Sequence, residues 1–176
     1  MKSTGVVRRV DDLGRIVIPK EIRRTLRIRD GESLEIFVDR EMIALKKFSK
    51  MSDMEEISKQ LVEIVNNVTQ KSVFIADRDN FIAGSGSLRK AYLHKPISKM
   101  LEVIMKERKN VVEHSLHSIE LCDSIKEEYS YVICPVITNG DAIGLVLIIS
   151  ENDDIGQVEE KMADVVSKFL GKHIEE

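Results

Sequence analysis

The arginines of this chain are gathered at its N-terminal end. Of the 11 arginines, 8 lie at or before Arg40, in a stretch of about fifty residues whose apolar segments are all short. Even a 60-residue domain removes only about 60% of its chain's surface from water. The stretch contains no cysteine pair and no metal-ligand cluster to compensate. We therefore expect it to fold only by pairing with a second copy of itself.

Charge divides the chain into two parts. Residues 1–50 hold 13 Lys and Arg against 8 Asp and Glu, whereas residues 51–176 hold 14 against 22. The first part is therefore +5 and the second −8. A basic block joined to an acidic remainder favours a polyanionic partner at the basic end only.

Local patterns in the basic part predict four strands and one helix. Gly14 follows a polar turn at Asp11 and Asp12 and permits a backbone conformation that a side chain would resist. Pro19 ends strand pairing and suits the first turn of a helix. We expect a helix over Lys20–Arg27 and strands over Gly5–Val10, Arg15–Ile18, Leu34–Val38 and Met42–Phe48.

The predicted helix has one apolar and one cationic side. Ile22 and Leu26 share a face, whereas Arg23, Arg24 and Arg27 project from the other side. Arginine offers a planar fork that can bridge two phosphate oxygens or grip a guanine edge. Duplex DNA is the partner that this side favours. The alternative is a solvated cationic face that binds nothing.

Three segments carry a family resemblance: Lys2–Asp11, Leu13–Pro19 and Glu21–Leu26. They resemble the AbrB-type transition-state regulators of spore-forming bacteria, which fold as dimers with interleaved strands. The resemblance implies a swapped-hairpin β-barrel built by two chains, and DNA recognition through shape more than through a fixed base code. It places the DNA-contacting arginines at Arg8, Arg15, Arg23 and Arg24, supported by Arg9 and Lys2.

Two amphipathic helices bracket the acidic part. Ser52-Asp53-Met54-Glu55 matches a capping box, so a helix is expected to begin there. The apolar residues of both helices follow the 3,4 spacing of a coiled-coil seam, which predicts self-association. The seam is formed by Met54, Ile57, Leu61, Ile64 and Val68 in the first helix, and by Ile155, Val158, Met162, Val165 and Phe169, widened by Val166 and Leu170, in the second.

Between these helices the pattern is mixed α/β. Asp77–Asn80 is expected to join two short strands, and Asn139-Gly140 is a strong hairpin signal. Pro96 precedes a helix, and further strands are expected over 111–121, 129–137 and 143–149. The order helix, two strands, helix, three strands, helix resembles a GAF domain. That resemblance implies an antiparallel sheet faced by helices, with a small-molecule sensor as one function.

Other candidate sites in this part are weaker. A ligand pocket near Asp77, Asn80, Ser85 and Ser87 and a set of plain turn residues are equally compatible with the sequence. The Gly84-Ser85-Gly86-Ser87 run lacks the lysine and spacing of a P-loop. His114 and His117 have no evident partner ligands, and Cys122 and Cys134 form no CxxC motif. We expect no metal, no cofactor and no catalytic residue.

Together these patterns predict an α+β chain with three segments: residues 1–50 as the swapped-hairpin DNA-binding domain, 51–55 as a linker, and 56–176 as a GAF-like domain. The combination resembles the AbrB-headed regulators that activate and repress sporulation genes in the forespore. We expect a cytoplasmic location, since no stretch reads as a signal peptide or membrane span, and association with the nucleoid. We also expect a tetramer, because the N-terminal dimer contact and the apolar seams provide two separate surfaces for self-association. The rival hypotheses are an antitoxin-like interaction protein and a cysteine-dependent enzyme.

Overall fold

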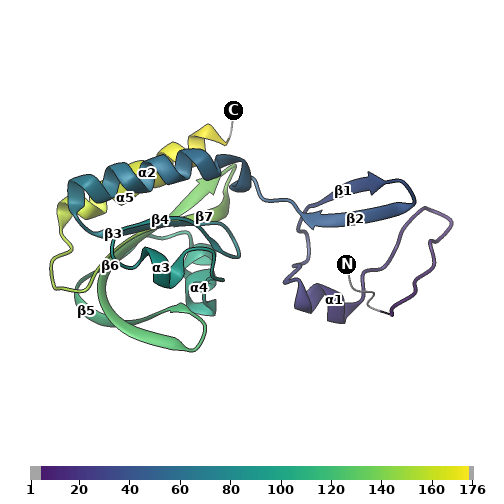
Figure 1. The fold of residues 1–176 in the computed structure, drawn as a ribbon, viewed down its shortest axis with the longest axis horizontal. Coiled ribbons are helices and arrows are strands. Elements are labelled where there is room, and N and C mark those ends of the chain that lie inside the picture. Colours follow the sequence, from purple (N-terminus) through teal and green to yellow (C-terminus); the bar gives the residue numbers. More distant parts are fainter. Residues whose placement is uncertain (1–4, 175–176) are drawn as a thin grey trace. The chain divides into compact units, whose positions relative to one another are not determined.

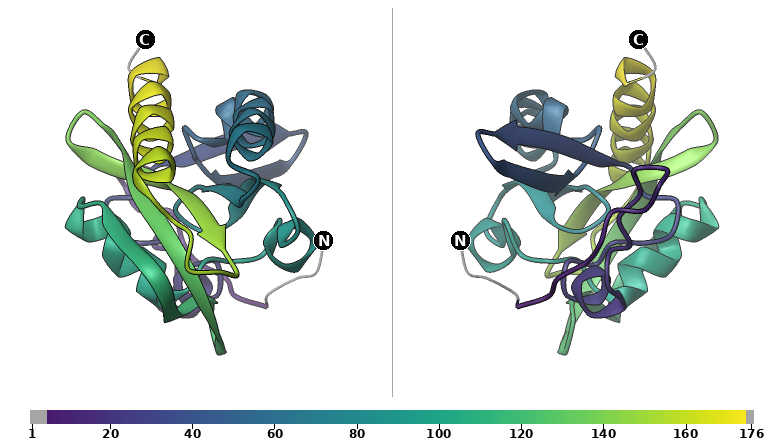
Figure 2. Two further views of the ribbon diagram at one scale, coloured as in Figure 1. Left: turned by 90° about the vertical axis from the view of Figure 1, so that its left-hand side faces the viewer. Right: turned by 90° about the vertical axis from the view of Figure 1, so that its right-hand side faces the viewer.

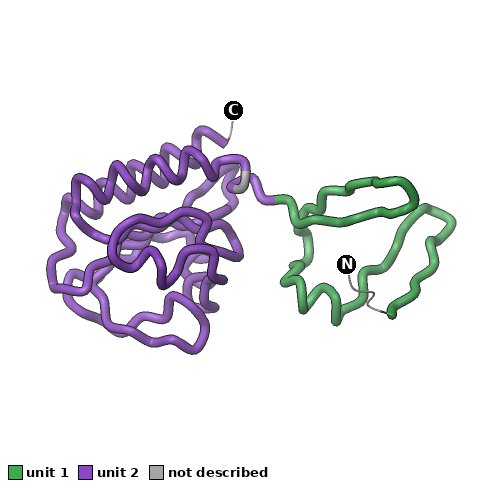
Figure 3. Tube along the Cα trace, viewed as in Figure 1, with its two compact units in different colours: residues 1–48 green, residues 49–176 purple. Residues whose placement is uncertain are grey.

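The computed structural model describes residues 5–174, and the chain forms two compact units, residues 1–48 and residues 49–176 (Figure 3). We call them the N-terminal unit and the C-terminal unit. The side chain of Ser52 is also outside the described part.

Within residues 5–48, the N-terminal unit contains one helix and one hairpin, α1 (Lys20–Thr25), β1 (Leu34–Asp39) and β2 (Met42–Lys47) (Figure 1). The two strands pair antiparallel in continuous register from Leu34 opposite Lys47 to Asp39 opposite Met42. Arg40 takes a left-handed backbone conformation in the two-residue turn between them. The predicted hairpin is therefore confirmed.

The N-terminal half of this unit differs from the prediction. No strand is assigned over residues 5–18, where Gly5–Val10 and Arg15–Ile18 were expected to be strands. Among residues 5–48 only Pro19 is buried, and Val7 is 85% exposed and Val17 73% exposed. A single chain of a swapped hairpin lacks the strands of its partner, so these apolar segments have no sheet to join. This unit encloses no core of its own.

The C-terminal unit is built on a five-stranded antiparallel sheet with the order β4-β3-β7-β6-β5. Its strands are β3 (Ser72–Ala76), β4 (Phe81–Ser85), β5 (Val111–Cys122), β6 (Ile125–Thr138) and β7 (Asp141–Ser150). Its helices are a short 3-10 turn, η1 (Ser52–Met54), followed by α2 (Glu55–Thr69), α3 (Arg89–Tyr92), α4 (Lys99–Glu107) and α5 (Gln157–His173).

Helices cover both faces of this sheet. Alternate strand residues point to opposite sides, so Ile75 and Ile148 belong to one apolar cluster and Phe74 and Leu147 to the other. Helices α2 and α5 lie side by side over the first cluster (Figures 1 and 2). The shorter α3 and α4 close the second cluster on the opposite face. The C-terminal unit therefore encloses two cores.

Both predicted turns of this unit are confirmed. Asn139 and Gly140 have positive φ angles of 49° and 81°, the conformation that a two-residue hairpin loop requires. In the other turn, the Asp77 side chain accepts hydrogen bonds from the backbone amides of Asp79 and Asn80, each at 2.7 Å. The short helix α3 was not expected from the sequence.

The start of this unit also differs from the prediction. Helical structure does begin where it was expected, with the 3-10 turn η1 leading into α2 at Glu55. The side chain of Ser52, which the predicted capping box requires, lies outside the described part. Residues 51–55 were expected to be a linker, but Met51 and Met54 are buried in the core beneath α2 and α5. These two methionines attach the beginning of α2 to the sheet.

Candidate nucleic-acid interface

Arg15 lies in a compact loop that Asp11 organises. Oδ1 of Asp11 accepts hydrogen bonds from the backbone amides of Leu13, at 3.0 Å, and Arg15, at 2.8 Å. Its Oδ2 accepts from Nε of Arg15 at 2.7 Å. The amide of Gly14, whose φ is +76°, donates to the Asp11 carbonyl and completes the turn. One carboxylate thus fixes both the backbone and the guanidinium of Arg15.

The same contacts act on the charge of Asp11. The backbone amide of Arg15, and then its guanidinium, lower the pKa of Asp11 below its ordinary value. Asp11 therefore carries a full negative charge at neutral pH. The charge-assisted bond it makes orients one edge of the Arg15 guanidinium and leaves the other free for a second anion.

Arg23 is oriented in a similar way on α1. Its Nη1 donates to Oδ1 of Asp30 at 2.8 Å, across the end of the helix. The amide of Ile28 donates to the Arg23 carbonyl at 2.7 Å, which turns the chain back after Thr25. The sequence placed Arg23 on the cationic side of the helix, but it did not reveal Asp30 as its partner.

The other predicted DNA contacts are less constrained. Arg8, Arg9 and Arg24 are exposed, and Arg8 donates to the neighbouring Val7 carbonyl at 3.2 Å. Lys2 lies outside the described residues. Those predicted cations that are described thus come from two segments of the N-terminal unit, residues 8–15 and the helix α1.

A second exposed feature is an apolar stripe on the outer sides of α2 and α5. The inner side of α2 is formed by Ser58, Val62, Val65 and Thr69, which are buried against the sheet. Of the predicted seam, Ile57, Leu61 and Met162 are partly buried at the edge of the core. Five further members face outward, namely Ile64, Val68, Val158, Val165 and Phe169. We call these five residues the apolar stripe.

The remaining seam residues serve the core. Ile155 is buried just before α5 begins, and Val166 and Leu170 form the inner side of that helix. Gly171 lies so close to β6 that an added Cβ would come within 2.3 Å of the Ile137 carbonyl oxygen. Helix α5 is thus held tightly to the sheet while Val165, 63% exposed, points away from it.

The four residues of the predicted ligand pocket do not converge. Asp77 and Asn80 shape the β3–β4 turn, whereas Ser87 lies beside Ser72, with 3.3 Å between their hydroxyl oxygens. Ser72 and Ser87 line a polar depression of about 100 Å³. The other residues that line it are Gln70, Lys71, Leu88, Ile149, Ser150, Glu151 and Asn152.

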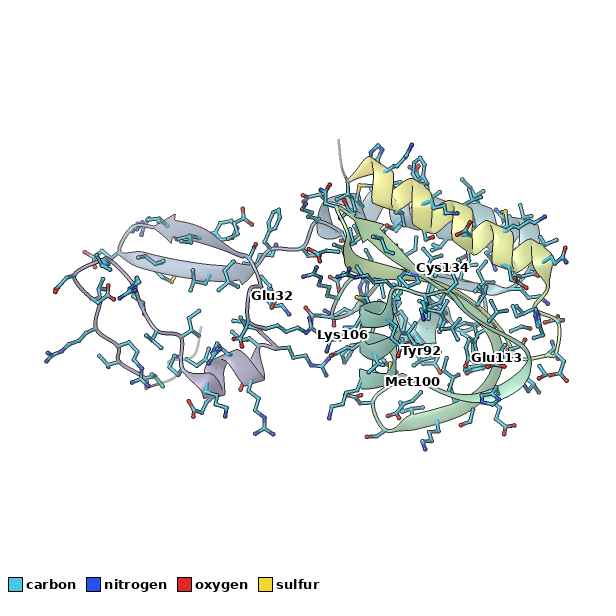
Figure 4. The ribbon with its side chains drawn as sticks, turned by 180° about the vertical axis from the view of Figure 1, so that it is seen from behind. Glu32, Tyr92, Met100, Lys106, Glu113 and Cys134 are labelled. Atoms are coloured by element: carbon cyan, nitrogen blue, oxygen red, sulfur yellow. The ribbon has the colours of Figure 1, made fainter. Side chains whose placement is uncertain are left out.

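A buried polar cluster beneath α3 was not foreseen from the sequence. Glu127 accepts hydrogen bonds from the hydroxyls of Tyr92 and Tyr129, the latter at 2.6 Å. Burial and the Glu127 carboxylate raise the pKa of Tyr129. Tyr92 comes from α3 (Figure 4) and also packs edge-to-face on Phe74, with the ring centroids 5.8 Å apart. Aromatic rings therefore fill the space between α3 and the sheet.

His114 and the two cysteines lie in environments that support the fold. Nδ1 of His114 lies 2.9 Å from the Ile155 carbonyl oxygen, which ties β5 to the segment before α5. Cys134 on β6 (Figure 4) is completely buried, and burial raises its pKa to about 12. Burial also raises the pKa of Cys122. Both cysteines are therefore neutral thiols at neutral pH rather than nucleophilic thiolates.

Metal-binding clusters and membrane-spanning helices are both absent from the described residues. Within residues 5–174, no group of three or more His, Cys, Asp and Glu side chains is arranged to hold a metal ion. No helix in that range is long and apolar enough to cross a membrane.

An arginine-bearing hairpin unit joined to a helix-faced antiparallel sheet defines a class of two-part proteins, with an AbrB-like domain followed by a GAF-like domain. Residues 53–175 match the family described as stage V sporulation protein T C-terminal, transcription factor. Residues 7–51 match the family described as antidote-toxin recognition MazE, bacterial antitoxin. The chain belongs to the stage V sporulation protein T family of transcription factors.

Individual relatives agree with this assignment. Stage V sporulation protein T of Bacillus subtilis (strain 168) is 48% identical over 178 residues, covering all of both chains. The transition state regulatory protein AbrB of the same organism is 65% identical over 48 residues, 27% of this chain and 50% of AbrB. The GAF domain of a Coxiella burnetii phosphoenolpyruvate-protein phosphotransferase shares the fold, with 14% identity, a TM-score of 0.54, and coverage of 69% of this chain and 82% of that chain.

Proposed function

We propose that residues 1–50 of two chains interleave and grip duplex DNA, through Arg8, Arg15, Arg23 and Arg24 with Arg9 and Lys2 in support. The observation that carries the proposal is the placement of these arginines in a unit that encloses no core. Carboxylates orient Arg15 and Arg23 there while leaving them at the surface. Such an arrangement does little for the stability of a single chain and suits the binding of an external anion.

The binding is expected to depend steeply on salt. Six cations per chain, doubled in a dimer, exceed the number of phosphate contacts, about 6–10, that lowers affinity by about 10³–10⁵-fold between 50 and 200 mM salt. We infer recognition through DNA shape and flexibility, because arginine and lysine side chains respond to the width of a groove and to the position of the phosphate backbone as well as to base edges.

The C-terminal unit would assemble these dimers. Five apolar side chains are exposed along α2 and α5, and such a contiguous patch is typical of a protein interface. Pairing through the apolar stripe would join two DNA-binding dimers into a tetramer. Residues 56–176 would then act as the oligomerisation domain.

We propose that this assembly activates some sporulation genes and represses others in the forespore cytoplasm, in association with the nucleoid. A small-molecule effector of the GAF-like domain belongs to the same proposal, and the polar depression at Ser72 and Ser87 is where we would look for it first. We propose that the chain acts as a regulator and not as an enzyme; the burial of both cysteines argues against the cysteine-dependent activity considered above.

The second candidate is an antitoxin-like role. The match of residues 7–51 to an antitoxin family favours it. Antitoxins with this type of DNA-binding domain mask their toxins with flexible acidic tails, which gain structure only on binding. The C-terminal unit has two closed cores instead, so we rank this role second.

The test is DNA binding by the full chain with Arg15→Ala and Arg23→Ala. Each change should weaken binding more than about tenfold, or about 1.4 kcal/mol, with little change in melting temperature. Arg40→Asn is the matched control, because it removes a cation from the β1–β2 turn and Asn tolerates the left-handed backbone there. If Arg15→Ala and Arg23→Ala both kept full affinity, the proposed contact surface would be wrong.

A further inference from the structure

The charge of the C-terminal unit is unevenly distributed. Residues 89–109 hold 7 of the 14 Lys and Arg found in residues 51–176, but only 2 of the 22 Asp and Glu. This segment spans α3, α4 and the loop that joins them. A local excess of positive charge thus lies within a part of the chain that is acidic as a whole.

All seven cations of this segment are exposed. On α4 they alternate with an inner side formed by Leu101, Ile104 and Met105, which are buried against the sheet. Figure 4 labels Lys106 and Met100 on this helix. The seven residues, which we call the α3–α4 cationic face, are Arg89, Lys90, Lys95, Lys99, Lys106, Arg108 and Lys109.

Nearby carboxylates reduce this excess without cancelling it. Nη2 of Arg108 lies 3.4 Å from Oδ1 of Asp141, and Oδ1 of Asp123 accepts from the Lys99 backbone amide at 3.0 Å. Glu102 and Glu107 belong to α4 itself, and Glu127 accepts a hydrogen bond from Tyr92 of α3. Seven cations against these five acids still leave a positive surface. Exposed charges of this kind add little to stability, so the stability of the fold does not explain their concentration.

The position of this face in the fold leaves it open in the proposed assembly. The apolar stripe lies on α2 and α5, which cover one side of the sheet. Helices α3 and α4 cover the other side. Self-association through the stripe would therefore leave the α3–α4 cationic face exposed.

We propose that the α3–α4 cationic face binds the phosphates of DNA that flanks the segment gripped by the N-terminal units. This inference rests on the proposed DNA-binding function. Once the N-terminal units hold a duplex, the chain connection keeps that polyanion at high effective concentration around the C-terminal unit. Five of the seven cations are lysines, which act as point charges suited to backbone phosphates rather than base edges. Binding at this face therefore raises the affinity for DNA and lengthens the DNA segment that is bound, without adding specificity for base sequence.

The test compares two full-length variants on two duplexes. The test variant is Lys99→Gln with Lys106→Gln, and its charge-matched control is Lys161→Gln with Lys172→Gln, two exposed lysines of α5. The probes are a duplex selected by the wild-type chain from a random-sequence pool, used bare and with flanks of about 20 base pairs, roughly two helical turns, on each side. Affinity is measured against salt concentration, and melting temperature is recorded for every variant.

We expect the test variant to bind the flanked duplex about fivefold more weakly than wild type, the scale of a few exposed charge pairs, and to bind the bare duplex normally. The salt slope on the flanked duplex should fall by about one for each lysine–phosphate pair that the substitutions remove. Equal behaviour of the test and control variants on the flanked duplex would overturn the inference. Arg15→Ala separates the two proposals, because it tests the N-terminal contacts on the bare duplex alone.

Discussion

Both units of this chain contain regular antiparallel hairpins, but only the C-terminal unit buries the apolar residues of its hairpins. In the C-terminal unit both faces of the sheet are covered, and Leu147 and Ile148, neighbours on β7, are each completely buried in a different core. In the N-terminal unit the β1–β2 hairpin is equally regular, yet Ile36 on its central rung is 65% exposed. Strand pairing alone therefore does not make a domain. One unit completes its core within the chain, and the other has to complete it with a second chain.

The largest effect should come from a charge placed on that exposed hairpin. If Ile36 were a true surface residue, Ile36→Asp would change stability by less than about 0.5 kcal/mol. Because we expect a partner chain to bury it, the carboxylate should cost several kcal/mol and abolish both N-terminal pairing and DNA binding. Light scattering and a DNA-binding assay on the full chain measure the two losses. Glu35→Gln, on the opposite side of β1, is the control and should leave both intact.

The next largest effect concerns the core of the C-terminal unit. Leu147→Ala removes a completely buried side chain and should lower the free energy of unfolding by about 2–5 kcal/mol. Ile125→Ala, at a position 43% exposed at the start of β6, should cost less than about 1 kcal/mol. Urea denaturation of both variants gives the comparison. Similar losses in the two would mean that this unit is not the self-contained fold described above.

A third prediction separates the two kinds of self-association. Val165→Asp places a charge in the middle of the apolar stripe and should convert tetramers into dimers while leaving the affinity of each dimer for DNA unchanged. Sedimentation or light scattering reads the mass, and Lys161→Asp on the same helix is the control. Leu61→Asp should also break the tetramer, but Leu61 packs partly against the core, so folding would suffer as well. A tetramer that persisted in Val165→Asp would place the interface elsewhere.

Much of the fold could be predicted because it depends on neighbouring residues. Asn139-Gly140 adopts the positive φ angles of a two-residue turn more readily than other residue pairs do, and it forms the expected hairpin. The strands expected at 5–10 and 15–18 do not form in the single chain, because local pattern does not supply the neighbouring strand that each would have to pair with. On α2, periodicity identified an apolar seam but did not tell which side meets the sheet. Val62 and Val65 occupy the inner side. Which side of α2 is buried depends on how the helix packs against the sheet, and the periodicity of the helix alone does not specify that packing.

The candidate site was also predictable only in part: its arginines were found from the sequence, but their carboxylate partners were not. The arginines were identified by their chemistry and by resemblance, since a guanidinium suits phosphate at any exposed position. Their carboxylate partners depend on three-dimensional geometry. Asp30 is seven residues from Arg23 and meets it only because the chain reverses after α1. The uneven charge of residues 89–109 was present in the sequence, but only the fold shows that it lies on the side opposite the apolar stripe.

The smallest predicted effect tests whether a carboxylate improves a DNA contact that it would be expected to oppose. Asp11→Asn and Asp12→Asn each remove one negative charge from the same loop, which by itself should strengthen DNA binding. Asp11→Asn also removes the charge-assisted bond to Arg15, so we expect its affinity to fall about threefold below that of Asp12→Asn. The lowered pKa of Asp11 means that the bond is present above that pKa and disappears as pH falls through it. The difference between the two variants should therefore be constant at neutral pH and vanish well below pH 4, about the ordinary pKa of an aspartate. Fluorescence anisotropy across this range measures it, and an Asp11→Asn variant that binds as well as Asp12→Asn at neutral pH would show that Asp11 shapes the loop without positioning Arg15.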